Sequence, residues 1–257
     1  MKPKPVRQRL DHLLVERGLA ESPEKAGALI LAGEVEVDGT RADKAGTPFP
    51  SNAKIKIISR HQKYVSRGGF KLEGALKDFA IRPAGRTCLD VGSSHGGFTD
   101  CLLQRGATRV YAVDVNVEQL DWRLRKDARV IPVKRNAREL AAEDIPEQVD
   151  LVTIDVSFIS VLQVIEPAAK LAKQGAIFVI LIKPQFELAR EKVGPGGIVK
   201  SKKLHEKVVL SIRKCLNPLG LKFLKVRPSR LPGTEGNQEY FLHARKNPGR
   251  IANTHAA

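Results

Sequence analysis

Residues 87–99 read Thr-Cys-Leu-Asp-Val-Gly-Ser-Ser-His-Gly-Gly-Phe-Thr, and this stretch decides the fold. It begins as a short apolar strand that contains an acidic residue, and it passes into a glycine-rich turn that opens a helix. A turn of this kind lets a cofactor lie against bare backbone at the end of a parallel sheet. The stretch therefore predicts a cofactor site in an α/β domain.

The spacing of the glycines indicates which cofactor is expected. They stand at positions 92, 96 and 97, whereas a dinucleotide motif would place them at 92, 94 and 97. Ser94 occupies the middle position, where its side chain hinders the close approach of a pyrophosphate. A ligand without phosphates fits better, and S-adenosylmethionine is the common one.

The composition points to a polyanionic partner. The chain has 257 residues, 42% of them hydrophobic, which is enough for one large domain or for a large and a small one. Its net charge is +16 at pH 7, and residues 61–257 hold +13 of this excess, with 33 basic against 20 acidic residues. A charge of this size is typical of proteins that bind nucleic acid or anionic lipid.

Cysteines and apolar runs indicate the cellular setting. Cys88, Cys101 and Cys215 lack the paired spacing of a zinc site or a disulfide framework, so no metal is expected and a reducing cytoplasm is the simplest location. The N-terminus shows no apolar signal segment. The longest apolar run, 176–182, is too short for a bilayer, which needs about 20 residues. We therefore expect no membrane partner and interpret that run as a buried central strand.

Residues 6–60 have the pattern of a small α+β module. Apolar residues recur at helical spacing from Leu10 onward. Ser22, which precedes a proline, predicts the start of a second helix, and Gly33 predicts its end. Alternation with period two then predicts short strands at 34–39 and 54–58.

Residues 67–246 alternate strands with helices, as a doubly wound parallel sheet does. The expected strands are 87–91, 109–114, 129–133, 150–155, 176–182, 221–227 and 239–245. The expected helices lie near 67–79, 97–105, 160–173 and 202–216, the last with an apolar stripe of Leu204, Val208, Ile212 and Cys215. The final two strands leave no room for a helix between them, so we expect an antiparallel pair at the sheet edge, similar to the Rossmann-like class I methyltransferase variant of this fold. Residues 61–66 are predicted to be a linker and residues 247–257 a disordered tail.

Residues around the glycine turn are the candidates for binding the cofactor. Asp114 ends the strand 109–114 about 20 residues after the turn, where a carboxylate can accept hydrogen bonds from ribose hydroxyls. The alternative is that Asp114 only caps the strand. Asn136 is placed to reach the adenine, whereas a histidine such as His95 is more often a packing residue in such a turn. The complete set is Asp90, Gly92, Ser93, Ser94, His95, Gly96, Gly97, Asp114, Val115 and Asn136.

Four charged residues at the ends of predicted elements are the candidates for catalysis: Lys71, Asp155, Lys183 and Glu239. In an open parallel sheet the ligand crevice lies at the carboxyl ends of the strands, so Asp155 and Lys183 are expected to face it. An apolar strand that stops at Lys183 also implies a partner for the buried charge. Taken alone, each of the four residues is equally compatible with a surface ion pair.

Methylation of a ribose 2′-hydroxyl would use these residue types. The hydroxyl is a weak acid and must lose its proton as it attacks the methyl carbon. Lys183 is expected to accept that proton, because a second ammonium group at Lys71 favours the neutral form of a nearby amine. Asp155 and Glu239 would orient the two lysines.

The first module resembles the S4 RNA-binding domain. The resemblance rests on the stretches 9–14, 18–22, 25–26, 30–35 and 37–39. Family members often carry an arginine after the serine, and here Pro23 stands in that place, so Lys25 or Arg9 must contribute more to phosphate binding. The RNA-binding candidates are Arg7, Arg9, Lys25 and Arg67. The alternative is a helical hairpin that serves oligomerisation.

The motifs together resemble the TlyA family, also called hemolysin A-type proteins, in which an S4 domain precedes an FtsJ-like methyltransferase domain. The matching stretches are 64–73, 89–100, 110–114, 119–120, 155–159, 182–187 and 194–197. The resemblance implies S-adenosylmethionine-dependent 2′-O-methylation of ribosomal RNA on cytidine, with a catalytic tetrad at Lys71, Asp155, Lys183 and Glu239. The sequence departs from the family at Ser94-His95 and at Asn116, which bears on donor affinity and leaves the tetrad intact.

Two other functions stay open at this point. A ribosome-assembly factor without activity would bind the same RNA, although the intact tetrad argues against it. A membrane-active cytolysin would need an apolar segment or an amphipathic helix with a broad apolar face, and the sequence shows neither. The expected partner is ribosomal RNA or a ribosomal subunit, while the subunit, the nucleotide and the oligomeric state are not determined by the sequence.

Overall fold

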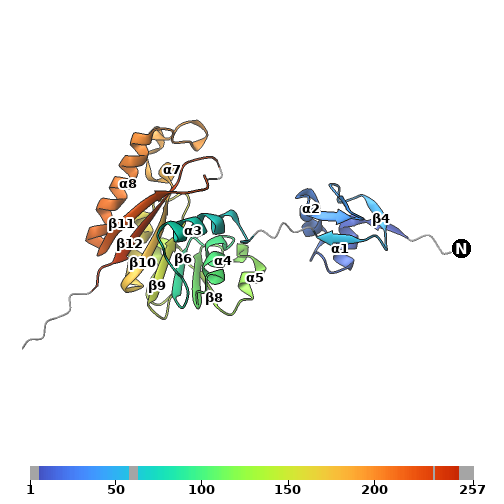
Figure 1. The fold of residues 1–257 in the computed structure, drawn as a ribbon, viewed down its shortest axis with the longest axis horizontal. Helices are drawn as coiled ribbons and strands as arrows, with labels where there is room; N and C mark the ends of the chain where they lie inside the picture. The colour runs from blue at the N-terminus through green and yellow to red at the C-terminus, as the bar shows by residue number, and fades with distance from the viewer. Residues whose placement is uncertain (1–5, 58–62, 234, 249–257) are drawn as a thin grey trace, which may run out of the picture. The chain divides into compact units, whose positions relative to one another are not determined.

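The computed structural model describes residues 6–57, 63–233 and 235–248, and the chain divides into two compact units, Met1–Gln62 and Lys63–Ala257 (Figure 1). Each unit has its own hydrophobic core. Within the described ranges, no helix has both the length and the apolar character needed to cross a membrane.

The first unit packs two helices against short strands around a small core. Its elements are β1 (Arg7–Arg9), α1 (Leu10–Glu16), α2 (Pro23–Leu31), β2 (Val35–Val37), β3 (Thr40–Arg41), β4 (Pro48–Pro50) and β5 (Ile55–Ile57). The Ser22 side chain caps α2 by accepting a hydrogen bond from the Lys25 N–H, and Gly33 follows the helix with φ +68°, so both predicted helix boundaries are confirmed. The predicted strand at 54–58 is β5, with residue 58 outside the described ranges.

The second unit is built on a seven-stranded sheet with the order β11-β12-β10-β9-β6-β7-β8 in its described part. The strands are β6 (Thr87–Val91), β7 (Arg109–Asp114), β8 (Val130–Lys134), β9 (Val149–Ile154), β10 (Ala172–Ile182), β11 (Leu221–Pro228) and β12 (Tyr240–Lys246). The strands β6 to β10 are parallel, and β12 is antiparallel to both β10 and β11, which confirms the predicted edge pair.

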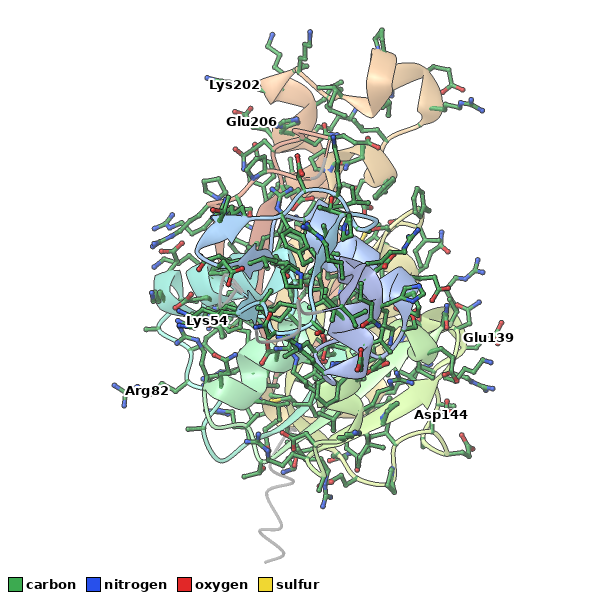
Figure 2. All side chains as sticks on the ribbon, turned by 90° about the vertical axis from the view of Figure 1, so that its right-hand side faces the viewer. Lys54, Arg82, Glu139, Asp144, Lys202 and Glu206 are labelled. Carbon is green, nitrogen blue, oxygen red and sulfur yellow. The ribbon has the colours of Figure 1, made fainter. Side chains whose placement is uncertain are left out.

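Helices cover both faces of this sheet. They are α3 (Arg67–Asp78), α4 (Gly97–Gln104), α5 (Trp122–Arg125), α6 (Leu162–Lys170), α7 (Pro184–Glu187) and α8 (Lys202–Leu216) (Figure 1). The helices α3, α4 and α5 share one buried cluster with alternate residues of the central strands, and α6 and α8 share the other cluster with the residues between them. Charged side chains such as Arg82, Glu139 and Lys202 project outward from the ribbon (Figure 2).

The buried face of α8 differs from the predicted stripe by about one residue. Val208 and Ile212 are buried as expected, but the stripe is completed by His205 and Leu216, while Leu204 and Cys215 are only half-buried. The reason is a polar network that local hydrophobicity does not reveal. His205 Nε2 lies 2.7 Å from the Val199 carbonyl oxygen, and its Nδ1 lies 2.9 Å from the Tyr240 hydroxyl.

The order of the strands determines where a ligand can bind. The chain runs outward from β6 to β7 and β8 and then returns to place β9 on the other side of β6. The crevice at such a switch point lies outside the carboxyl ends of the strands. Gly92 follows β6, and Asp155 follows β9, so the glycine turn and one predicted catalytic carboxylate meet at this crevice.

Candidate active site

The glycine turn after β6 exposes bare backbone at the crevice. Gly92 has φ +83°, and a Cβ atom there would lie 2.2 Å from the Asp155 carbonyl oxygen. Gly97 begins α4, and a Cβ atom there would lie 2.1 Å from Ser66 Oγ. No side chain can be added at either position without moving neighbouring atoms, so glycine is required by close packing and, at Gly92, also by the left-handed backbone.

A cleft extends from this turn to the ends of β7 and β8. Of the predicted cofactor residues, Gly92, Ser94, Asp114, Val115 and Asn136 line it. The two Asp114 carboxylate oxygens accept hydrogen bonds from the N–H groups of Ser94 and Asn116, at 2.9 Å and 3.0 Å. These bonds hold the carboxylate at the edge of the cleft, where the sequence places a partner for ribose hydroxyls.

A second pocket adjoins this cleft and contains all four predicted catalytic residues. Lys71, Asp155, Lys183 and Glu239 line it together with Ser66, Arg67, Gly68, Gly92, Ser93, Ser94, Gly97 and Phe98. Gly92, Ser94 and Asp155 line both hollows, so the two sites are continuous. Residues separated by up to 168 positions along the chain therefore converge beside the glycine turn, as the sequence predicts.

The four charges form two ion pairs. Lys71 Nζ lies 2.6 Å from Glu239 Oε2, and Lys183 Nζ lies 2.6 Å from Asp155 Oδ1. Lys183 is only 8% exposed, and its Nζ also donates a hydrogen bond of 2.8 Å to Ser157 Oγ. Two cations and two anions balance within one pocket, which explains how an apolar strand can end in a buried ammonium group.

Three predicted cofactor residues lie apart from the cleft surface. Asp90 is fully buried and accepts hydrogen bonds from the Thr99 and Thr153 hydroxyls at 2.7 Å and 2.8 Å. Burial raises the pKa of the Asp90 carboxyl to about 6. His95 is exposed and lies 3.2 Å from Ser94 Oγ through its Nδ1, and Gly96 packs beneath Leu120 and Leu124. Neither His95 nor Gly96 is among the residues that line the two hollows.

The predicted RNA-binding residues of the first unit already have partners within that unit. Arg9 forms an ion pair of 2.6 Å with Asp11, and Lys25 pairs with Glu21 one helical turn away. Arg7 donates a hydrogen bond of 2.7 Å to the Pro48 carbonyl oxygen. All three side chains stay exposed to solvent, so these contacts orient them without burying the charge. Arg67 belongs to the second unit, where it is exposed and lines the catalytic pocket.

Ser157 and Phe158 are among the lining residues of the site that were not assigned from the sequence. Ser157 accepts the hydrogen bond from Lys183, and Phe158 lies at the wall of the donor cleft with 87% of its surface exposed and φ +67°. Both belong to the stretch 155–159, which the sequence marks as a family motif but in which only Asp155 receives a role. The motif itself was the signal that more than one of its residues serves the site.

The chemistry of the cleft fits a methyl donor that carries a positively charged sulfur. Its floor is backbone at Gly92, and its walls include the apolar side chains of Val115, Phe158 and Ile159. Asp114 and Asp155 supply negative charge, and Arg135 is the one basic side chain among the described lining residues. A pyrophosphate would need more cations or a glycine in place of Ser94. S-adenosylmethionine, which has a ribose, an adenine and a sulfonium but no phosphate, matches this lining.

This sheet, its antiparallel edge and the paired lysine and carboxylate site define the class of FtsJ-like methyltransferases. The family model described as FtsJ-like methyltransferase matches residues 64–246, and the S4 domain model matches residues 8–55. Within this class, the chain belongs to the TlyA family.

Three relatives illustrate this membership. The chain is 46% identical over 246 residues to the 16S/23S rRNA (cytidine-2′-O)-methyltransferase TlyA of Mycobacterium tuberculosis, covering 95% of this chain and 92% of that protein. It is 38% identical over 237 residues to Hemolysin A of Brachyspira hyodysenteriae, covering 91% of this chain and 98% of that protein. The solved structure of a candidate hemolysin from Streptococcus thermophilus superposes with a TM-score of 0.71 at 38% identity, covering 95% of this chain and 90% of that chain.

Proposed function

We propose that this protein uses S-adenosylmethionine to methylate the 2′-hydroxyl of a cytidine ribose in ribosomal RNA. The observation that carries the proposal is the convergence of Lys71, Asp155, Lys183 and Glu239 in one pocket that is continuous with the donor cleft. The names of the TlyA relatives supply the substrate, because the Mycobacterium tuberculosis protein is a 16S/23S rRNA (cytidine-2′-O)-methyltransferase.

When bound, S-adenosylmethionine supplies an electrophilic methyl group on a positively charged sulfur. Asp155 lines both hollows and pairs with Lys183, so its carboxylate would also face the positive charge of a bound donor. Lys183 in its neutral amine form accepts the proton of the ribose hydroxyl. Glu239 holds Lys71 in place through their 2.6 Å contact.

The surface around the pocket suits RNA. Phe158 exposes its ring at the cleft, 5.2 Å from the ring centre of Phe186, and a base drawn out of the RNA can stack on such an exposed ring. Arg67 at the start of α3 offers a positive charge for a phosphate. A ribosomal subunit is the proposed partner, and the cytoplasm, where ribosomes assemble, is the proposed location.

The test is transfer of a tritiated methyl group from S-adenosylmethionine to isolated ribosomal subunits. The key variant is Lys183→Met, and the matched control is Lys173→Met. Lys173 stands at the other end of β10 and pairs with Asp150 at 2.8 Å, remote from the pocket. We expect Lys183→Met to lose at least about 100-fold in rate, because general-base catalysis contributes about 10²–10⁴. Donor binding should change by less than about threefold, in line with a general-base role, and Lys173→Met should retain full activity.

Other outcomes separate the competing functions. If Lys183→Met keeps its rate within tenfold of the wild type, the assigned role of Lys183 is wrong. If the wild type binds RNA tightly but transfers no label to either subunit, the protein is a binding factor without activity. Because one relative is named Hemolysin A, a further assay measures whether the purified protein lyses red cells. Lysis without methyl transfer would overturn the proposal in favour of a cytolysin.

A further inference from the structure

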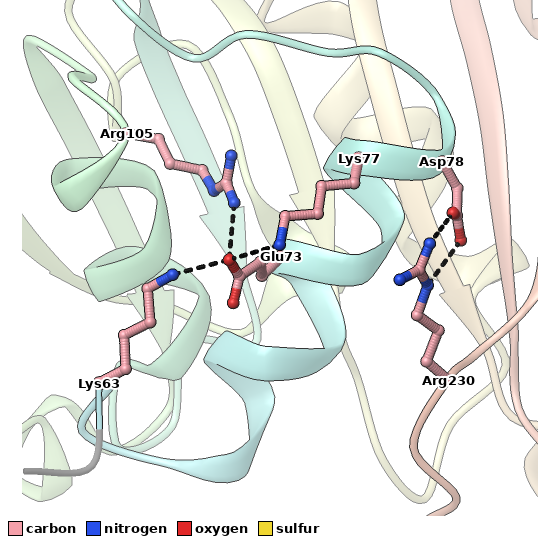
Figure 3. Close-up of polar contacts among 6 residues, drawn as sticks. All are labelled: Lys63, Glu73, Lys77, Asp78, Arg105 and Arg230. Carbon is pink, nitrogen blue, oxygen red and sulfur yellow. Dashed lines mark hydrogen bonds and ion pairs between the residues drawn. The ribbon is translucent and has the colours of Figure 1, made fainter.

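Two ion pairs join the same two segments of the second unit. The first is the catalytic pair of Lys71 on α3 with Glu239, which precedes β12. In the second, Arg230 Nη2 and Nε donate to the two carboxylate oxygens of Asp78 at the end of α3 (Figure 3). The Nε contact is 3.3 Å long. Glu239 and Arg230 are therefore both attached to α3, Glu239 inside the pocket and Arg230 outside it.

One side of α3 is shaped to receive Arg230. Lys71, Gly74 and Asp78 are spaced by three and four residues, which places them along one face of the helix. A Cβ atom at Gly74 would lie 3.1 Å from Arg230 Cδ and 3.4 Å from its Cγ. The aliphatic part of Arg230 therefore crosses the helix at the residue that has no side chain, between the catalytic lysine and Asp78.

A short backbone hydrogen bond connects Ser229, the neighbour of Arg230, to Glu239. The Ser229 N–H donates to the Glu239 carbonyl oxygen at 2.7 Å, so the neighbour of Arg230 is bonded directly to the catalytic residue. The Gln238 side chain donates to the same carbonyl oxygen at 2.8 Å. The Glu239 side chain packs closely against Gly233, where a Cβ atom would lie only 2.7 Å from its Oε1. A shift of Arg230 is thus transmitted to the carboxylate that faces Lys71.

We propose that Arg230 is a positioning residue, which holds its own part of the chain against α3 and so, through the bond between Ser229 and Glu239, brings Glu239 to Lys71. The inference rests on the proposed methyl transfer and adds a residue that does not line the catalytic pocket. The Arg230 side chain is 59% exposed, so its ion pair adds little to global stability. Its effect is local. The two-pronged contact fixes the orientation of the Arg230 guanidinium relative to the Asp78 carboxylate, whereas a single ammonium contact would leave that orientation free.

The experiment measures kcat and KM for donor and RNA in Arg230→Ala, Arg230→Lys, Asp78→Ala and the double variant with alanine at both positions. The control is Arg129→Ala, because Arg129 makes the same two-pronged contact with Asp127 beside β8 and is similarly exposed. We expect Arg230→Ala and Asp78→Ala each to lower kcat about threefold to tenfold, with the donor KM within about twofold. The lysine variant should recover part of the loss, and the double variant should be no slower than either single one.

The two single variants change the charge in opposite directions, so a general effect on RNA attraction cannot explain a loss common to both. The positioning role is overturned if kcat is unchanged in Arg230→Ala, if the two losses multiply in the double variant, or if Arg129→Ala loses as much. The wild type is measured in the same assay. Label from the wild type with no loss in Arg230→Ala refutes only the positioning role, whereas absence of label from the wild type refutes the methyl transfer itself.

Discussion

Glu73 on α3 is the centre of a cluster whose contribution to stability follows from its charge. Its Oε1 faces three cations, Lys63 at 2.7 Å, Arg105 at 3.0 Å and Lys77 at 3.1 Å (Figure 3). The Lys63 ammonium, followed by that of Lys77, lowers the pKa of the Glu73 carboxyl to about 2 from its usual 4.5. The variant Glu73→Gln keeps the shape of the side chain and removes the charge, so it isolates this electrostatic contribution.

The size of the effect follows from the pKa shift. The pKa of Glu73 differs by about 2.5 between the folded and the unfolded state, which corresponds to about 3.4 kcal/mol at about 1.36 kcal/mol per pKa unit. Lys63 and Lys77 are 50% and 57% exposed, so solvent screening reduces the expected loss to about 1–2 kcal/mol. Because the folded-state pKa of Glu73 is depressed, its contribution is complete above about pH 5 and disappears as the pH falls toward 2. For a unit of this size the loss at pH 7 lowers Tm by about 3–6 °C.

Urea unfolding followed by circular dichroism at pH 7, 5 and 3.5 measures this difference between Glu73→Gln and the wild type. The gap in free energy of unfolding should be largest at pH 7, should narrow as the pH falls, and should shrink in 1 M salt. Glu166→Gln is the control, because Glu166 lies on the exposed side of α6, pairs among the described residues only with Lys170, and should cost less than about 0.5 kcal/mol. A gap that is the same at pH 3.5 and pH 7 would refute the electrostatic explanation and point to side-chain packing instead.

Three further outcomes are expected. Gly92→Ala should weaken donor binding by at least about 100-fold, as measured by calorimetry. The added Cβ atom would collide with the Asp155 carbonyl oxygen, and the backbone at this position is left-handed. A donor affinity within about threefold of the wild type would contradict this prediction. The raised pKa of Asp90 means that its contribution to stability is lost as the pH rises from about 4 through about 6, so the difference in urea unfolding between Asp90→Asn and the wild type should change across that range. Phe158→Ala should weaken RNA binding about 5- to 150-fold in a filter assay, as loss of one stacked base predicts, and an unchanged RNA affinity would contradict the stacking role.

Local patterns in the sequence were sufficient to identify the frame of the catalytic unit. The bounds of β6 and β7 match the prediction, because an apolar run between turn residues encodes a buried parallel strand without outside help. The short strands β1, β3 and β4 were not predicted, since two or three residues carry no detectable period and are held by their neighbours in the sheet. Asp155 and Lys183 were identified by their place at the carboxyl ends of strands, where ligands bind in an open sheet, and the resemblance to the TlyA family implied the complete tetrad with Lys71 and Glu239.

The amino-acid sequence by itself determined the order of elements, the glycine turn and the residue types available for methyl transfer. Only the tertiary structure decided which charge meets which, because Lys71 and Glu239 are 168 positions apart and no local pattern encodes their contact. The tertiary structure also decided the contacts of Asp90. This residue lies in the stretch 87–99, but its carboxylate accepts hydrogen bonds from two threonine hydroxyls inside the core. Periodicity specifies which side of an element is apolar, whereas the partner of a polar group depends on distant segments that packing brings together.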